Sequence, residues 1–441
     1  MSNFVSIKSP IQPFKKKIYV SSDKSLSIRF VLLAAQAIGK SKAYNLLDSE
    51  DVNSALKCVK KLGVKVLKKK NCVEIIGNGL NGFTYEKDTT IDAGNSGTLA
   101  RLILGLLVKS KKQIKLIGDK SLSKRDFSRI AIPLSMFGAK IKTNNNSLPI
   151  KVCGNKFLRP INYFEKVGSA QVKSFCCLAA LNSPGITKIK AKKSRNHTEI
   201  LFKNLKLPIK IKTKENYDYI EIEGLNHYRG FNYKIPGDIS SAGFFIVLTL
   251  LSKKSQIIIK NVNLNDRRSG IIKILNKMNG KIKLLNKRTY KGELISDIKI
   301  KSQNNFKSIN CNSNLNSSAI DEFLIIFLVA AKAKGISKFK NLGELDKKES
   351  PRLKIASNFL KMIGIKNKLE KDNLKIYGNP KLELKNKYEI KNYVKDHRVF
   401  AMSCVAALTL GGKWKIHDKD SINTSFPLFL RKLKSLGAKI N

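Results

Sequence analysis

Residues able to bind anions recur where the sequence predicts that helices begin. Ser25 and Arg29 are four residues apart, so they share one face of a predicted helix that starts near Lys24. The stretch Gly94 to Arg101 opens another helix with two glycines, which let backbone N–H groups approach an anion. Phosphate and carboxylate groups bind at helix starts because hydrogen-bond donors and positive charge meet there. These positions are therefore expected to bind small anions.

Other predicted helix starts also carry hydroxyl, amide and cationic groups. They are Gly168 to Ser174, Ser194 to Glu199, Pro236 to Ala242 and Lys395 to Arg398. A polar loop adds Arg125. We expect Asp238 and Asp396 to act as helix N-caps, and His197 to cap or pack rather than to catalyse. The recurrence of these groups fits a small, multiply anionic substrate pair.

The strongest acid and base candidates are two carboxylates in one part of the chain. Asp321 lies at the start of a predicted buried helix, and Glu349 lies just before the next helix, within Lys347 to Arg352. The chain has few acids, and carboxylates placed beside cations are suited to proton transfer. The sequence thus predicts a general acid and base that act on a bound anion.

A repeated pattern indicates which elements position these residues. One pattern occurs six times: an amphipathic segment ends at a glycine, and basic and apolar residues alternate after it. In the third copy Pro208 replaces the glycine. Glycine after a helix supplies a left-handed C-cap residue, and the alternation has the period of a strand. The glycines are Gly63, Gly138, Gly280, Gly364 and Gly437.

A second pattern, a short and nearly all-apolar helix, also occurs six times. The stretches are Val31 to Ala37, Leu102 to Val108, Cys176 to Leu181, Phe244 to Leu251, Ile325 to Ala331 and Ser403 to Leu410. A helix that is apolar all round must be buried. Each repeat unit of about 74 residues then contains a buried helix, a strand, an amphipathic helix and a strand.

Six such units predict two domains of three units, because a single core rarely grows beyond about 250 to 300 residues. We expect the break at Tyr233 to Asp238, where Pro and Gly interrupt the pattern. A cleft between the two domains is the expected place for a ligand.

The composition excludes several classes of protein. With 441 residues, 42% of them hydrophobic, the chain can bury large cores, so disorder, collagen and coiled coil are excluded. The longest apolar stretch, Phe323 to Ala331, is too short to span a bilayer, and Met1 to Ser22 lack an apolar signal core. The seven cysteines show no metal-ligand spacing. We expect a cytoplasmic protein with reduced thiols, without a bound metal and without a membrane segment.

The charge raises the possibility of a nucleic-acid partner. Lys and Arg number 85 against 32 Asp and Glu, a formal net charge of +53. The lysines are scattered, however, and a genome rich in A and T would produce this Lys-, Asn- and Ile-rich composition without selection for binding. We also expect basic and aromatic side chains not to cluster, as base stacking would need. An RNA-binding or RNA-end-processing protein is therefore kept as a lesser alternative.

Taken in order, the motifs resemble those of the enolpyruvyl transferase family of 3-phosphoshikimate 1-carboxyvinyltransferase (enolpyruvylshikimate phosphate synthase). The resemblance runs from about Lys24 to Lys439. Its motifs are Lys24 to Arg29, Gly94 to Thr98, Ser169 to Ser174, Pro236 to Ala242, Ile320 to Glu322, Lys348 to Ser350, Asp396 to Arg398 and Thr424 to Pro427.

The resemblance implies an α/β fold with two domains, each of three βαβαββ units around buried helices, an inside-out α/β barrel with the cleft between the domains. Residues 23–235 would form the N-terminal domain and mainly bind shikimate 3-phosphate. Residues 1–22 and 236–441 would form the C-terminal domain, with the acid and base and with phosphoenolpyruvate binding.

The implied reaction transfers the enolpyruvyl group of phosphoenolpyruvate to the 5-hydroxyl of shikimate 3-phosphate and releases phosphate, in chorismate and aromatic amino-acid biosynthesis. Asp321 would accept the hydroxyl proton and Glu349 would deliver or remove the methylene proton, with Lys24 also catalytic. Shikimate 3-phosphate would be bound by Lys24, Ser25, Arg29, Ser169, Ala170, Gln171, Arg195, Asp321 and Lys348. Phosphoenolpyruvate would be bound by Lys24, Gly97, Arg125, Gln171, Arg352 and Arg398.

The resemblance further implies a monomer that needs no cofactor, acts on small anionic molecules and is inhibited by glyphosate close to Gly97. The nearest alternative is the sister transferase that acts on UDP-N-acetylglucosamine, which uses a cysteine in a mobile loop. The corresponding residues here, Asp119 to Phe127, contain no cysteine.

Overall fold

The computed structural model describes residues 3–441, which form two compact units. The N-unit consists of Ser22–Pro236 together with a short later segment, Tyr290–Glu293. The C-unit consists of residues 3–21, Gly237–Thr289 and Leu294–Asn441. The inclusion of Tyr290–Glu293 in the N-unit is a feature that the sequence patterns do not indicate.

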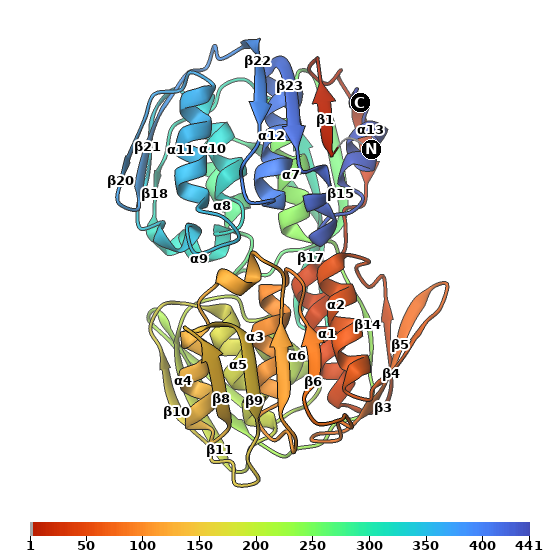
Figure 1. Cartoon of the computed structure of the whole chain (residues 1–441). Helices are drawn as coiled ribbons and strands as arrows, with labels where there is room; N and C mark the ends of the chain where they lie inside the picture. Colours follow the sequence, from red (N-terminus) through yellow and green to blue (C-terminus); the bar gives the residue numbers. More distant parts are fainter. Residues whose placement is uncertain (1–2) are drawn as a thin grey trace. The chain divides into compact units, whose positions relative to one another are not determined.

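Three small sheets surround the N-unit, and each has the same plan (Figure 1). In each sheet the first two strands run parallel, and the other two form an antiparallel hairpin that pairs with the second strand. A buried helix connects the two parallel strands in two of the sheets, whereas in the third they come from opposite ends of the segment. The sheet β14–β3–β5–β4 contains β3 (Ile38–Tyr44), β4 (Lys65–Lys68), β5 (Cys72–Asn78) and β14 (Asn232–Lys234). The sheet β6–β7–β9–β8 contains β6 (Thr89–Asp92), β7 (Ile114–Ile117), β8 (Lys140–Asn144) and β9 (Ser147–Cys153). The sheet β10–β11–β13–β12 contains β10 (Asn162–Glu165), β11 (Ile186–Lys192), β12 (Ile209–Lys214) and β13 (Tyr217–Glu223).

The C-unit contains three further sheets, two of four strands and one of three, and each again includes a parallel pair. The sheet β16–β17–β15–β2 contains β2 (Lys15–Ile18), β15 (Gln256–Asn263), β16 (Lys281–Tyr290) and β17 (Glu293–Lys301). The sheet β18–β19–β21–β20 contains β18 (Asn310–Cys311), β19 (Gly335–Phe339), β20 (Asn367–Glu370) and β21 (Asn373–Gly378). The sheet β1–β23–β22 contains β1 (Phe4–Ile7), β22 (Leu384–Ile390) and β23 (Gly411–His417).

In both units, a sheet is completed by a strand that is far away in sequence from its neighbour. The N-terminal strands β1 and β2 pair with β23 and β15 of the C-unit, as Figure 1 shows for β1 beside β23. In the N-unit, β14 at the end of the segment pairs with β3 near its beginning. Each unit is therefore closed by strands that are distant in sequence.

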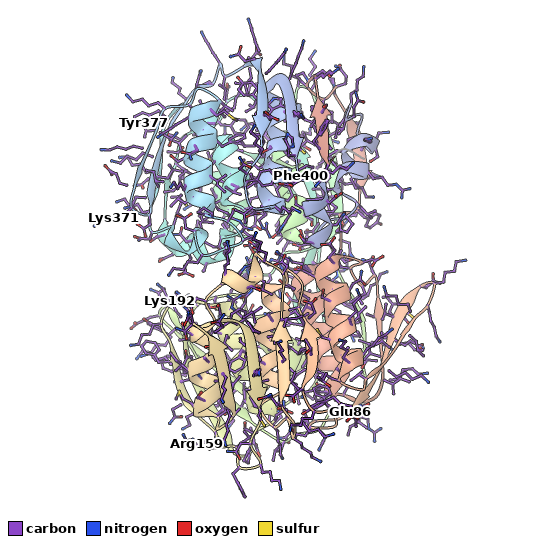
Figure 2. The ribbon with its side chains drawn as sticks, in the orientation of Figure 1. Glu86, Arg159, Lys192, Lys371, Tyr377 and Phe400 are labelled. Carbon is purple, nitrogen blue, oxygen red and sulfur yellow. The ribbon has the colours of Figure 1, made fainter. Side chains whose placement is uncertain are left out.

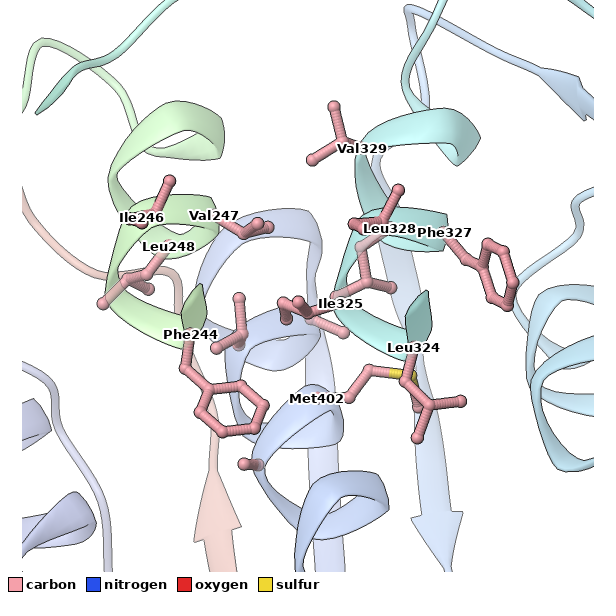
Figure 3. Close-up of a cluster of buried hydrophobic side chains, with 14 of the residues drawn as sticks. Phe244, Ile246, Val247, Leu248, Leu324, Ile325, Phe327, Leu328, Val329 and Met402 are labelled. Carbon is pink, nitrogen blue, oxygen red and sulfur yellow. The ribbon is translucent and has the colours of Figure 1, made fainter. Parts of the chain in front are cut away.

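The apolar helices form the centre of each unit. The N-unit has α1 (Lys24–Gln36), α3 (Gly97–Leu106) and α5 (Ala170–Leu181), and the C-unit has α7 (Ile239–Leu251), α10 (Phe323–Ala331) and α12 (His397–Leu410). Figure 3 shows Phe244 of α7, Leu324 and Ile325 of α10 and Met402 of α12 in one cluster. The predicted α/β fold of repeated units with buried helices is confirmed. Among residues 3–441 the sheets stay separate and no single closed barrel forms.

The amphipathic helices cover these cores. They are α2 (Glu50–Lys61), α4 (Ser128–Met136), α6 (His197–Asn204), α8 (Gly270–Lys277), α11 (Arg352–Met362) and α13 (Phe429–Ser435), and a short α9 (Asn316–Ala319) precedes α10. Glycines with φ from 77° to 101° follow four of them, as predicted. Gly280 does not have this role, because Asn279 with φ 70° takes the left-handed position.

Basic side chains lie on the outer strands, and apolar ones point inwards. Figure 2 shows Lys192 and Lys371 at the outside and Phe400 within the C-unit. The expectation that basic and aromatic groups do not cluster is wrong on one sheet. The ammonium group of Lys190 lies 4.9 Å, 5.1 Å and 5.6 Å from the ring centres of Phe164, Tyr217 and Tyr219. Alternate residues of β10, β11 and β13 share this face, and their clustering follows from strand pairing.

Two further properties concern the whole described chain. None of the helices formed by residues 3–441 is both long and apolar enough for a membrane crossing. All seven cysteines carry free thiols, and five of them are buried.

Candidate active site

Side chains that precede the buried helices cap their first turns. Asp23 accepts a hydrogen bond from the backbone N of Leu26 at 2.9 Å, and Asp396 accepts one from Arg398 N at 2.9 Å. Ser96, Ser169 and Asp238 cap α3, α5 and α7 in the same way. The predicted caps Asp238 and Asp396 are confirmed. These caps fix the residues of the first turns, where the candidate site residues lie.

In the N-unit, Arg29 joins three helices. Its Nε donates to Thr198 Oγ1 of α6 at 2.8 Å, and its Nη2 donates to Ser174 Oγ of α5 at 2.8 Å. Arg29 is only 4% exposed, so these hydrogen bonds are needed to satisfy a buried guanidinium group. The same side chain also donates to the carbonyl of Ser25 at 3.2 Å.

A second set of contacts joins α3 to α5 and to the loop that carries Arg125. Gln171 Nε2 donates to Thr98 Oγ1 at 3.0 Å, and Arg125 Nη2 donates to Asn95 Oδ1 at 3.2 Å. A Cβ atom added to Gly97 would lie 2.7 Å from Arg125 Nη1. A guanidinium group therefore lies directly against the backbone at the start of α3.

Lys24 stands at the start of α1 and forms an ion pair with Asp51 of α2, with 2.7 Å between Nζ and Oδ2. Asp51 is buried, and its charge balances a cation that is itself largely covered. The sequence patterns did not single out Asp51, although acidic residues at the first turn of α2 are the available signal. Ser169, Ala170 and Arg195 lie at the starts of α5 and α6, partly exposed.

In the C-unit, three cations surround Asp321. Its Oδ1 lies 3.6 Å from Lys348 Nζ and 3.5 Å from Arg352 Nη1, and its Oδ2 lies 3.7 Å from Arg398 Nη2. Arg398 Nη1 also donates to the backbone carbonyl of Asp321 at 2.8 Å. The side chain of Asp321 is 12% exposed, so part of this carboxylate remains open to solvent.

Arg352 is held by a buried partner. Its Nε and Nη2 donate to the two carboxylate oxygens of Asp396 at 2.8 Å and 3.2 Å. Burial alone would raise the pKa of Asp396, but the charge and hydrogen bonds of Arg352 outweigh burial and hold that pKa below its ordinary value. Burial would lower the pKa of Arg352, and the surrounding carboxylates raise it above its ordinary range. Both groups are therefore charged at neutral pH.

Glu349 and Glu322 complete this part of the site. Glu349 hydrogen-bonds to Arg352 and is 20% exposed. Glu322 accepts from Ser240 and lies 3.7 Å from Arg398. Buried beneath them, Arg268 donates to Asp238 at 2.9 Å and to Ser240 at 3.1 Å. Neither Arg268 nor Glu322 was predicted as a site residue, and Arg268 has no neighbouring motif that could have indicated it.

The predicted site residues thus form two sets, one in each unit. The N-unit set is Lys24, Ser25, Arg29, Gly97, Arg125, Ser169, Ala170, Gln171 and Arg195. The C-unit set is Asp321, Lys348, Glu349, Arg352 and Arg398. Within residues 3–441, no three or more His, Cys, Asp or Glu side chains come together as a metal site.

The pairing of Arg352 with Asp396 predicts a pH-dependent contribution to stability. Asp396→Asn should lower the free energy of urea unfolding at pH 7 by about 3 kcal/mol, because a buried cation loses its main partner. Arg352 holds the pKa of Asp396 below its ordinary value in the folded protein, so this contribution is complete above the ordinary carboxyl pKa and is lost as the pH falls through the lowered value. The difference between wild type and variant should therefore narrow in acid.

The matched control is Glu370→Gln, which removes an exposed carboxylate that pairs with Lys368 at 2.6 Å. This substitution should change the unfolding free energy little, since an exposed ion pair is screened by water. Equal unfolding free energies of wild type and Asp396→Asn at pH 7, or a difference that widens as the pH falls, would contradict the assignment.

Comparison with known proteins places the chain in a family. Residues 8–433 match the model of EPSP synthase (3-phosphoshikimate 1-carboxyvinyltransferase). Proteins named 3-phosphoshikimate 1-carboxyvinyltransferase from Ruthia magnifica and Zymomonas mobilis are each 37% identical to it, covering 100% and 99% of this chain and 99% and 96% of their own lengths.

Solved structures agree with this result. An EPSP synthase from Acinetobacter baumannii has a TM-score of 0.86 at 34% identity, with 99% of both chains covered. An enolpyruvyl transferase from Streptomyces tendae shares the fold with a TM-score of 0.76 at 12% identity, over 99% of this chain and 98% of that one. With its repeated units and its two sets of charged residues at helix starts, the chain belongs to the EPSP synthase family.

Proposed function

We propose that the two sets of site residues together carry out the family reaction. The enzyme transfers the enolpyruvyl group of phosphoenolpyruvate to the 5-hydroxyl of shikimate 3-phosphate and releases phosphate. This step belongs to chorismate and aromatic amino-acid biosynthesis. The observation that carries the proposal is the group around Asp321, in which a partly exposed carboxylate lies within 3.7 Å of three cations and near a second carboxylate, Glu349.

Shikimate 3-phosphate binds mainly to the N-unit set in this proposal. Arg29 is already held by Ser174 and Thr198, so it meets the ligand without a large loss of side-chain freedom. Hydroxyl groups and backbone N–H groups at helix starts suit a phosphate. The proposed ligands are Lys24, Ser25, Arg29, Ser169, Ala170, Gln171, Arg195, Asp321 and Lys348.

Phosphoenolpyruvate carries a phosphate and a carboxylate, and guanidinium groups bind both in a bidentate manner. Arg352 is oriented by Asp396, and Arg398 is oriented by the carbonyl of Asp321. At Gly97, the missing side chain lets the guanidinium groups of Arg125 and Arg101 lie against the backbone. The proposed ligands are Lys24, Gly97, Arg125, Gln171, Arg352 and Arg398.

Asp321 and Glu349 then transfer the protons. Asp321 accepts the proton of the 5-hydroxyl group while the oxygen of that hydroxyl group bonds to C2 of phosphoenolpyruvate. At the same time Glu349 delivers a proton to the methylene carbon. The resulting tetrahedral intermediate loses phosphate when Glu349 takes a proton back from that carbon, which restores the double bond. Lys24, held by Asp51, supplies positive charge to the phosphate that leaves. The methylene proton thus returns to Glu349, and the 5-hydroxyl proton passes from Asp321 to the released phosphate. No cofactor is therefore required.

The two carboxylates give a direct test of this mechanism. Replacing Asp321 or Glu349 by Ala should lower turnover by roughly two to four orders of magnitude, the usual contribution of a positioned acid or base. Circular dichroism should show an intact fold. The matched control is Glu344→Gln, because Glu344 is an exposed carboxylate of the same segment that pairs with Lys347. Normal turnover in a folded Asp321 or Glu349 variant would refute the assigned role.

The choice of acceptor separates this reaction from that of the sister transferase. The purified protein should release phosphate only when phosphoenolpyruvate and shikimate 3-phosphate are both present. A coupled assay of released phosphate measures this. Equal release with UDP-N-acetylglucosamine as the acceptor would make the sister reaction the better description.

Membership of the family implies inhibition by glyphosate close to Gly97, in competition with phosphoenolpyruvate. A methyl group added by Gly97→Ala would lie 2.7 Å and 2.8 Å from the guanidinium groups of Arg125 and Arg101, which have to shift. A bulkier ligand should suffer more from this crowding. We expect the inhibition constant of glyphosate to rise about tenfold, a loss of 1.4 kcal/mol, and the KM of phosphoenolpyruvate to rise much less.

The KM of shikimate 3-phosphate is the internal control and should stay unchanged in Gly97→Ala. An insensitive wild-type enzyme, or an equal loss of affinity for inhibitor and substrate, would show that Gly97 does not border the inhibitor.

We also propose that the enzyme acts as a cytoplasmic monomer without a nucleic-acid partner. The ammonium group of Lys190 already covers the rings of Phe164, Tyr217 and Tyr219, where bases would have to stack. Filter binding with RNA at physiological salt should then show no useful affinity, and a steep dependence on salt concentration would oppose this proposal.

A further inference from the structure

A short segment of the C-terminal half of the chain forms part of the N-unit. It is the turn Tyr290–Glu293 between β16 and β17, which we call the strap. Its flanking strands belong to a sheet of the C-unit, where β17 pairs with β15. The strap itself groups with Ser22–Pro236. A turn of this kind would normally extend into solvent, so its contacts within the N-unit call for an explanation.

The strap is fitted closely to the N-unit. The phenol oxygen of Tyr290 accepts a hydrogen bond from the backbone N of Lys234 at 3.0 Å, and its ring packs edge-on against Tyr233 with 5.5 Å between centres. Gly292 has φ 83°, and a Cβ atom there would lie 2.8 Å from Ile200 of α6. A side chain at this position would press against Ile200, and the positive φ also favours glycine.

The strap ends on a buried polar contact. Glu293 Oε1 lies 2.6 Å from His197 Nδ1, and both side chains are completely buried. A carboxylate in such surroundings costs free energy unless it is paired. The pair joins residues that are 96 positions apart in sequence. The burial of the pair and its short distance therefore indicate a specific structural contact.

His197 is the first residue of α6, directly after Arg195 and Asn196. The next residue, Thr198, accepts the hydrogen bond from Arg29, and Glu199 pairs with buried Lys173 at 2.7 Å. Three consecutive residues of one helical turn thus each contact a side chain from a different element. The strap supplies one of these contacts.

We propose that the strap positions the shikimate 3-phosphate site. Glu293 holds His197, and His197 fixes the first turn of α6. Arg195 is then placed for the phosphate, and Thr198 is placed to hold Arg29. Glu293 and His197 act through these neighbours and are positioning residues. The inference rests on the proposed function, in which Arg195 binds shikimate 3-phosphate.

Steady-state kinetics of Glu293 variants test this role. Glu293→Ala should raise the KM of shikimate 3-phosphate about tenfold, the change expected when one buried hydrogen bond is lost. The KM of phosphoenolpyruvate and kcat should change less than about threefold, because the reacting groups are elsewhere. Glu293→Gln keeps an acceptor oxygen and should restore most of the affinity. A merely stabilising contact would lower the unfolding temperature without this difference between the two substrates.

A matched control is Glu74→Gln, since Glu74 is a buried carboxylate of the same unit that pairs with Lys69 at 3.1 Å. It should leave both KM values unchanged. The positioning role is wrong if Glu293→Ala leaves the KM of shikimate 3-phosphate within about twofold of wild type, or raises both KM values equally.

A second pair of variants covers the case in which Glu293→Ala does not fold. Gly292→Ala would press the strap against Ile200, whereas Gly39→Ala has a similar φ of 86° with nothing within 4 Å. Only Gly292→Ala should raise the KM of shikimate 3-phosphate, and equal effects of the two substitutions would overturn the proposal.

Arg195→Ala distinguishes a failure of the strap proposal from a failure of the proposed phosphate site. If it leaves that KM unchanged in a wild-type background, the assigned phosphate site is wrong, whatever the strap does.

Discussion

A cation that binds an anionic substrate has to be held in place and kept charged before the substrate arrives. The candidate active site depends on this constraint. Each unit meets it by pairing a cation with a buried acid: Lys24 with Asp51 in the N-unit, and Arg352 with Asp396 in the C-unit. A buried ion pair adds little net stability, but the loss of one partner is costly. These acids therefore act chiefly by fixing the position and charge of the cations, in a chain with 85 basic and only 32 acidic residues.

The repeated architecture supplies equivalent positions for these groups. Asp23 and Asp238 cap the first buried helix of their units, and their backbone N atoms donate to Pro236 and Ser21 at 2.8 Å and 2.9 Å. The start of α10 departs from the pattern. Glu322 occupies the N-cap position there and accepts from Ser240, and Asp321 beside it faces the cations. The cap position of α10 therefore holds a side chain that contacts a neighbouring helix instead of its own first turn.

Sequence patterns predict what is local and periodic. The six apolar stretches appear as buried helices because each must hide its whole surface, and four glycines take the left-handed positions that their motifs require. Contacts between distant residues leave no such pattern. Arg268 and Glu293 lie in polar stretches that carry no recognised motif, and only the fold shows that they are buried beside Asp238 and His197. The Lys190 cluster was missed for the same reason, since strand pairing brings its rings together.

The lengths of the helices explain why some site residues need distant support. The helices α1 and α12 have 13 and 14 residues and are buried along most of their lengths, so their own apolar surfaces anchor the turns that carry Lys24 and Arg398. The helix α6 has only 8 residues, too few to be stable alone, and it lies at the edge of the core. Its first turn gains stability from contacts with α1, α5 and the strap, through Arg29, Lys173 and Glu293. In our proposal, a short helix held in this way depends on residues that do not touch the substrate, and such residues have to be sought in the structure because motifs do not mark them.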